Sequence, residues 1–285
     1  MNLEEAKKIV FPKKPVFASL YEKYGKENWT KYIEEKFPKK SFLNEKKEEL
    51  FEAIREITLP VLGEEKTEKI INTLNKTGFV SSADHNGPLS HPFFSHFALL
   101  RAKKDETLIS FVCGSISLSN SSYPRGFYFH DESLNEIKLP FVSLNGRKRS
   151  IYGHEGFAKA QIQRILNQEF RIEMKPDVRK RLRKFLEKIL ETEKLFSFKL
   201  LSDQFLLLND LLWEEIFGDT LGNLAYLETE TIVRNLLLKK HIGKGTIFDK
   251  IIFNKEIRES FIKNFEGVAC THDTENKKGS HLFWY

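Results

Sequence analysis

The chain has 285 residues, of which 40% are hydrophobic and 25 are Phe, so it can bury a sizeable core as one large unit or two smaller ones. Its two cysteines, Cys113 and Cys270, exclude a disulfide framework and a cysteine-rich zinc site. The net charge of +6 is concentrated in residues 175–188, where seven basic and two acidic side chains leave a local surplus of five.

The sequence shows no targeting or membrane signal. The first eight residues carry charges of both signs and lead into no long apolar run. Together with the low cysteine content, this favours a reducing compartment, so we expect a soluble cytoplasmic protein with no membrane partner. The oligomeric state stays open.

Residues 1–76 are predicted to form a helical scaffold. Apolar residues recur at helical spacing over 45–59, before Pro60, and over 64–76, before Gly78. No cluster of uncommon polar side chains stands out in this part, so we expect it to support a site rather than to contain one.

Residues 77–153 are predicted to form a β-rich unit. Segments 107–118 and 126–130 read as strands, and residues 138–144 and 147–152 flank Asn145-Gly146, a dipeptide suited to a type I′ hairpin turn. The fold class we expect is therefore mixed α and β (α/β or α+β), with this central unit and its hairpin flanked by N-terminal and C-terminal helices.

Residues 154–285 are predicted to be helical and to end in a short apolar strand. The clearest helix covers 177–193, and three others cover 201–217, 224–239 and 255–265. The first should bury Leu182, Phe185, Leu186 and Ile189 and expose Arg179, Lys180 and Arg183. The aromatic segment 282–285 should dock on the body of the protein. The three parts together should form one compact assembly.

The most unusual stretch is residues 81–96, which reads as a strand, a turn and a helix start. Asp84, His85 and His91 lie in it, and imidazole and carboxylate serve as acid, base or divalent-metal ligands near neutral pH. The alternative is structural: Asp84 caps a turn made by Asn86-Gly87, and His91 caps the next helix. Both interpretations stay open, with Asp84, His85 and His91 as the candidate catalytic and metal-binding set.

Two further segments carry candidate substrate-binding groups. Loop 119–126 brings together amide, phenol and guanidinium groups in Asn120, Tyr123 and Arg125, which suit a carboxylate or phosphate. His154 follows the predicted hairpin. With Asn86 from the first turn, these residues form the candidate substrate-binding set, although a plain connecting loop has a similar composition.

Several familiar signatures are missing. The sequence has no glycine-rich dinucleotide fingerprint, no HExxH, no paired CxxC and no nucleophile elbow. Cys113 fits a buried strand better than a nucleophile. These absences remove the best-known nucleotide and hydrolase motifs.

The sequence leaves two functional hypotheses. The preferred one is an enzyme acting on a small polar, anionic molecule, by metal-assisted hydrolysis or group transfer; a hydrolase or a transferase would fit. The alternative is a nucleic-acid-binding or protein-interaction module that uses the basic helix 175–188. Nucleic acid is the less favoured partner.

Overall fold

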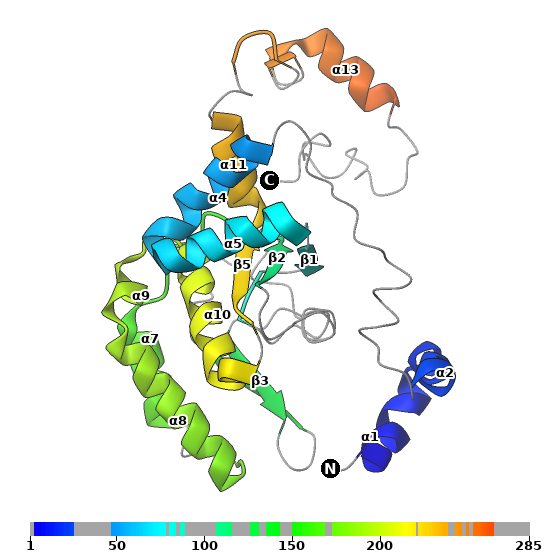
Figure 1. The fold of residues 1–285 in the computed structure, drawn as a ribbon, viewed down its shortest axis with the longest axis vertical. Coiled ribbons are helices and arrows are strands. Elements are labelled where there is room, and N and C mark those ends of the chain that lie inside the picture. The colour runs from blue at the N-terminus through cyan, green and yellow to red at the C-terminus, as the bar shows by residue number, and fades with distance from the viewer. Residues whose placement is uncertain are drawn as a thin grey trace.

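The structure is a computed structural model that describes residues 3–25, 47–77, 80–83, 86–88, 107–115, 126–130, 135–142, 150–168, 173–220, 222–238, 243–246, 249–250 and 253–264. This part of the chain is mixed α and β, and helices dominate it (Figure 1). The strands described form a parallel three-stranded sheet and an antiparallel pair. The mixed fold class expected from the sequence is confirmed at this level.

The N-terminal part is helical. It contains α1 (Leu3–Val10), the 3-10 turn η1 (Phe11–Lys13), α2 (Pro15–Tyr24), α4 (Lys47–Leu62) and α5 (Glu64–Thr77). Helix α4 continues past Pro60, where the sequence predicted its end, because Val61 in the added turn is buried. Gly63 separates α4 from α5 with a φ of 85°, a left-handed conformation that glycine adopts without strain.

The parallel sheet has the strand order β1-β2-β5 (Val80–Ala83, Leu108–Val112 and Leu224–Glu228). Ala83, Val112 and Glu228 are in register, so the three strands end at one common edge. Helix α10 (Leu201–Phe217) packs on β5, and α11 (Thr229–Leu236) begins as β5 ends and packs on α4. The prediction of one helix over 224–239 was wrong, because residues 224–228 form strand β5. This strand is buried on both faces, so its sequence is apolar throughout and does not alternate between apolar and polar residues.

The second sheet pairs β3 (Gly126–His130) with β4 (Glu136–Pro140) in antiparallel register. Strand β3 matches the segment predicted from the sequence, and β4 overlaps the start of the predicted hairpin. Residues 143–149 lie outside the described part, so the hairpin around Asn145-Gly146 stays a prediction.

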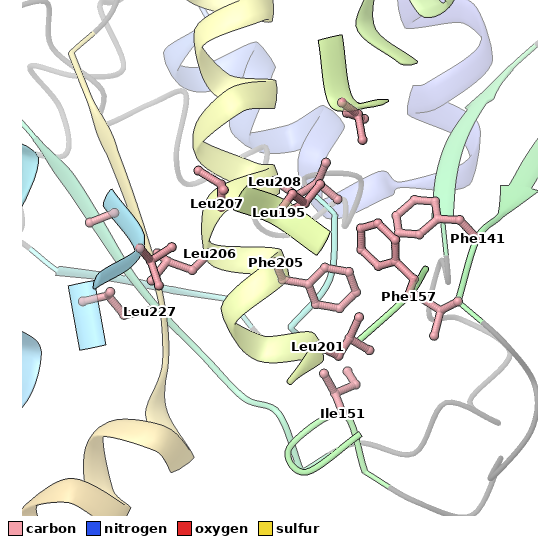
Figure 2. Close-up of a cluster of buried hydrophobic side chains, with 14 of the residues drawn as sticks. Phe141, Ile151, Phe157, Leu195, Leu201, Phe205, Leu206, Leu207, Leu208 and Leu227 are labelled. Atoms are coloured by element: carbon pink, nitrogen blue, oxygen red, sulfur yellow. The ribbon is translucent and has the colours of Figure 1, made fainter. Parts of the chain in front are cut away.

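The core contains a row of aromatic rings that connects strand β3, the segment after β4 and helix α8. Phe141, directly after β4, stands with its ring centroid 5.2 Å from Phe127 and 4.7 Å from Phe157. Phe127 also meets Phe185 edge-on at 5.8 Å. Figure 2 shows Phe141 and Phe157 beside Phe205 and Leu201 of α10. The same buried cluster includes Phe51 of α4, so all three parts predicted from the sequence contribute to one core.

The C-terminal helices described are α7 (Lys159–Gln168), α8 (Pro176–Glu191), α9 (Glu193–Ser197), the short η3 (Gly218–Thr220) and α13 (Lys255–Asn264). In α8, Phe185, Leu186 and Ile189 are buried and Leu182 is partly buried, while Lys180 and Arg183 are exposed. The predicted faces of this helix are therefore confirmed, except that Arg179 is partly buried.

Among the described helices, none combines the length and the apolarity that a bilayer crossing requires. The segment 282–285 lies outside the described residues.

A partly buried ion pair connects α5 to α10. Lys66 Nζ lies 2.5 Å from Asp210 Oδ2, whose side chain is only 9% exposed. Burial raises the pKa of the Asp210 carboxyl, and the attraction of Lys66 offsets part of that rise. Desolvation therefore outweighs pairing at this carboxyl.

The raised pKa of Asp210 makes a pH-dependent prediction for Asp210→Asn. Between the unfolded and the folded pKa, the native state binds more protons than the unfolded state, so this carboxyl stabilises the fold most at low pH. We expect the free energy of unfolding of the wild type, relative to Asp210→Asn, to fall as pH rises from about 4 towards neutrality. Denaturant unfolding at several pH values measures it. A difference that grows with pH would show that the attraction of Lys66 dominates.

Candidate functional site at the carboxyl edge of the parallel sheet

Polar side chains gather where the three parallel strands end. Asn86 follows β1, Cys113 to Ser115 follow β2, and Glu228 closes β5 at the start of α11. The carboxyl edge of a parallel sheet is where open α/β folds usually place their ligands, because loops leave the sheet there beside helix N-termini. This edge is the candidate site.

At the centre of the edge lies a group that we call the Glu228 cluster: Asn86, Ser202, Glu228 and Thr231. All four side chains are more than nine-tenths buried. Asn86 Nδ2 donates to Glu228 Oε1 at 3.0 Å, and Thr231 Oγ1 donates to Glu228 Oε2 at 2.5 Å. The Ser202 hydroxyl lies close to the same carboxyl. The carboxyl thus interacts with residues from the β1 turn, α10 and α11.

Burial affects the pKa of the Glu228 carboxyl more than its neighbours do. Desolvation raises the pKa of the carboxyl, and the three neighbouring polar side chains lower it again in part. The nearby carboxylate of Glu230 raises the pKa of Glu228 further. Among the described residues, no lysine or arginine contributes to this balance. A buried acid without a cationic partner is unusual, because isolated buried charge is costly.

The turn Asn86–Pro88 is held at the sheet edge from three directions. Asn86 N donates to Cys113 O at 2.8 Å, and Gly87 N donates to the Tyr226 hydroxyl at 3.2 Å. Asn209 Nδ2 donates to Gly87 O at 2.8 Å. Burial raises the pKa of the Tyr226 phenol, which therefore stays a hydrogen-bond donor or acceptor without charge. Hydrogen bonds to three separate segments therefore fix the position of this turn.

Glu230 organises the loop that follows β2. Its carboxylate accepts from Gly114 N at 2.7 Å and Ser115 N at 2.8 Å, and Cys113 Sγ donates to Oε1 at 3.2 Å. Burial raises the pKa of the Cys113 thiol. The thiol form is the weaker nucleophile, which does not favour a catalytic role for Cys113. The sequence placed Cys113 in a buried strand, whereas it lies directly after β2 and is partly buried.

Close packing of this loop depends on Gly114. A Cβ atom at that position would stand 2.0 Å from Glu228 Oε1 and 2.6 Å from its Cδ. The missing side chain therefore leaves the space that the Glu228 carboxyl occupies.

The structure places two of the residues that the sequence singled out. Asn86 belongs to the Glu228 cluster, so its side chain is committed to a protein contact. His154 is 8% exposed and interacts through Nδ1 with Glu155 O at 2.7 Å. Its carbonyl accepts from Leu201 N, and the neighbouring Tyr152 N donates to Gly114 O. His154 thus lies on a segment that runs between the β2 loop and the start of α10.

The other predicted site residues are not placed: Asp84, His85, His91, Asn120, Tyr123 and Arg125 lie outside the described residues. Within the described ranges, no three His, Cys, Asp or Glu side chains come together as a metal-binding group. The divalent-metal prediction made on Asp84, His85 and His91 therefore stays a prediction.

Sequence reasoning missed the acidic half of the site. Glu228 and Glu230 follow the apolar run 224–227, and that run was assigned to a helix. Had it been read as a buried strand, the acidic residues at its end would have marked a sheet edge. Tyr226, Ser202 and Asn209 carried no such signal, because they stand within apolar segments.

Comparison with known proteins gives no relative. A scan against protein-family models, a search of curated proteins and a search of solved structures each found no match. The function is therefore argued from the site itself.

Proposed function

We propose that this protein is an enzyme that acts on a small polar, anionic molecule at the carboxyl edge of the parallel sheet, by metal-assisted hydrolysis or group transfer. One observation carries the proposal: Asn86, Tyr226, Asn209 and Glu228 commit buried polar groups to holding a single short turn in place. Burying these polar groups costs desolvation free energy. A functional reason for such an arrangement is that it places the neighbouring groups precisely.

The proposed chemistry comes from residues adjacent to that turn in the sequence. Asp84 and His85 stand between Ala83, where β1 ends, and Asn86, where the clamped turn begins. We assign them, with His91, the roles of acid, base or divalent-metal ligands. A metal at these residues would polarise a carbonyl or phosphoryl group or activate water.

Substrate binding is assigned to Asn120, Tyr123 and Arg125, with His154 as a further contact. Arg125 offers the planar fork that binds carboxylates and phosphates. Asn86 is assigned a positioning role, because its amide nitrogen and its backbone N–H both donate within the protein; its amide oxygen, which has no partner among the described residues, is the group it could offer to a substrate.

The test uses the full chain and an unbiased pool of polar metabolites. Wild type is incubated with the pool and a mixture of Mg²⁺, Mn²⁺ and Zn²⁺, and mass spectrometry follows which compounds are consumed. We expect selective loss of one anionic compound or a few related ones, and a drop in rate of at least about 100-fold in Asp84→Asn/His85→Gln. Lys180→Ala on α8 is the control and should retain full activity.

A second function is favoured by the exposure of α8. Lys180, Arg181 and Lys184 are exposed, and no ion pair engages them among the described residues. A basic helix face of this kind binds phosphate backbones. Affinity for generic RNA or DNA that falls steeply with salt, and that Lys180→Glu/Arg181→Glu abolishes, would support a nucleic-acid-binding module. If the metabolite pool also stayed unchanged, the enzyme proposal would be abandoned.

A further inference from the structure

The Glu228 carboxyl is buried among neutral and acidic groups. Glu228 is 6% exposed, and the groups that face its carboxyl belong to Asn86 of the β1 turn, Gly114 of the β2 loop, Ser202 of α10, Tyr226 of β5, and Glu230 and Thr231 of α11. None of these groups is a cation, whereas the buried Asp210 is paired with Lys66. An ionised Glu228 would therefore lack a counterion in the described part of the chain, which is costly.

A buried oxygen beside this carboxyl lacks a hydrogen-bond partner. Ser202 Oγ lies close to the Glu228 carboxyl, but it makes no hydrogen bond of normal geometry with any described residue. A neutral carboxylic acid differs from a carboxylate in carrying one O–H donor. That donor would serve Ser202 Oγ, while Glu228 Oε1 goes on accepting from Asn86 Nδ2 at 3.0 Å. Unsatisfied buried oxygens are rare in folded proteins, so the hydrogen bonding favours the neutral acid.

We propose that Glu228 is held as a neutral carboxylic acid that donates to Ser202 Oγ, and that its ionisation at higher pH loosens the turn Asn86–Pro88 from the sheet edge. Burial and the nearby Glu230 both raise the pKa of this carboxyl. Once the proton has left, water must reach the carboxylate to solvate it. Local opening of a loop costs less free energy than unfolding of a sheet, so the turn is the part that moves.

The opening of the turn has a consequence for the candidate site. Asp84 and His85 directly precede Asn86 in the sequence, so a loosened turn would no longer position the residues to which we assign the chemistry. This consequence rests on the proposed function, whereas the proton on Glu228 and the opening of the turn do not. Both are measured without substrate, so they can fail while the enzyme proposal stands, and the reverse.

Infrared spectroscopy of the full chain tests the proton. At about pH 6, ordinary Asp and Glu side chains, with pKa values of about 3.9 and 4.3, are almost fully ionised. We expect the wild type to show the C=O band of a protonated carboxyl, weaker by one carboxyl in Glu228→Gln. Asp210, whose pKa burial also raises, contributes equally to both proteins. If the band is absent, or equally strong in Glu228→Gln, the proposal is wrong.

Thr231→Val gives a second infrared comparison that does not depend on Glu228→Gln. The Thr231 hydroxyl donates to Glu228 Oε2 and lowers the pKa of this carboxyl. Since valine has the same shape and no donor, the Glu228 band should persist to a higher pH in Thr231→Val than in wild type. If Glu228→Gln does not fold, this comparison decides, and a band that persists no further than in wild type overturns the proposal.

Denaturant unfolding tests the linkage to stability. Glu228→Gln has the shape of the neutral acid, so it should be as stable as wild type at low pH. A raised native pKa stabilises the fold fully below the unfolded pKa, and this contribution is lost as the pH rises through the native pKa. We therefore expect the stability of the wild type, relative to Glu228→Gln, to fall from about pH 4 upward. A relative stability that rises with pH would contradict the proposal.

Amide hydrogen exchange tests the turn. The backbone N–H groups of Asn86 and Gly87 donate to Cys113 O and the Tyr226 hydroxyl, so their exchange reports whether the turn is seated. Dividing the wild-type rate by the Glu228→Gln rate at each pH removes the intrinsic pH dependence of exchange. We expect this ratio to be close to unity at low pH and to rise at least about fivefold once the Glu228 band has disappeared. Glu155→Gln, at an exposed carboxyl, should exchange as wild type does. A ratio that stays constant with pH would refute the loosening of the turn.

Discussion

Replacing Phe141 with Ala is expected to cost about 3–5 kcal/mol in the free energy of unfolding. The ring is fully buried and lies at the centre of the aromatic row, in contact with Phe127 and Phe157. Its loss removes the transfer free energy of a large side chain, leaves a cavity and breaks two ring pairs. Denaturant unfolding measures the loss, provided that the m-value stays unchanged.

Phe253→Ala is the matched control, since it makes the same chemical change at a side chain that is 74% exposed. We expect its free energy of unfolding to stay within about 0.5 kcal/mol of wild type. Equal losses for the two variants, or a loss of less than about 1 kcal/mol for Phe141→Ala, would show that the aromatic row is not part of the stable core.

The second large effect is expected for Gly114→Ala, at about 3 kcal/mol. The added methyl group would overlap Glu228 Oε1, so the carboxyl must leave its place. It would then give up its hydrogen bonds to Asn86 and Thr231, and overpacking of a core position adds about 1–3 kcal/mol of its own. Thermal and denaturant unfolding both measure this loss.

Two comparisons isolate the cause. Gly243→Ala is the control, because a Cβ atom there meets nothing within 4 Å and its φ is not in the left-handed region; it should be neutral. In a Glu228→Ala background, Gly114→Ala should add less than about 1 kcal/mol, since the obstructing carboxyl is gone. Additive losses in the double variant would mean that Gly114 and Glu228 do not compete for the same space.

Local signals in the sequence predicted much of the secondary structure. Pro176 and Asp177 with an apolar stripe at helical spacing predicted α8, and its buried residues follow that stripe. Strand β3 and helix α10 also match the predicted segments. The prediction failed at residues 224–228, because a strand buried on both faces has no alternation of apolar and polar residues. Periodicity cannot separate such a strand from a buried helix.

By itself, the sequence determined the mixed fold class, the amphipathic face of α8 and the position of Asn86 in a turn after a strand, because these follow from the spacing of neighbouring residues. Only the tertiary structure decided that Asn86 meets Glu228, 142 residues further along the chain, and that Gly87 meets Tyr226 and Asn209. Those contacts arise because three parallel strands end in register, and register depends on packing between distant segments. No local pattern encodes it.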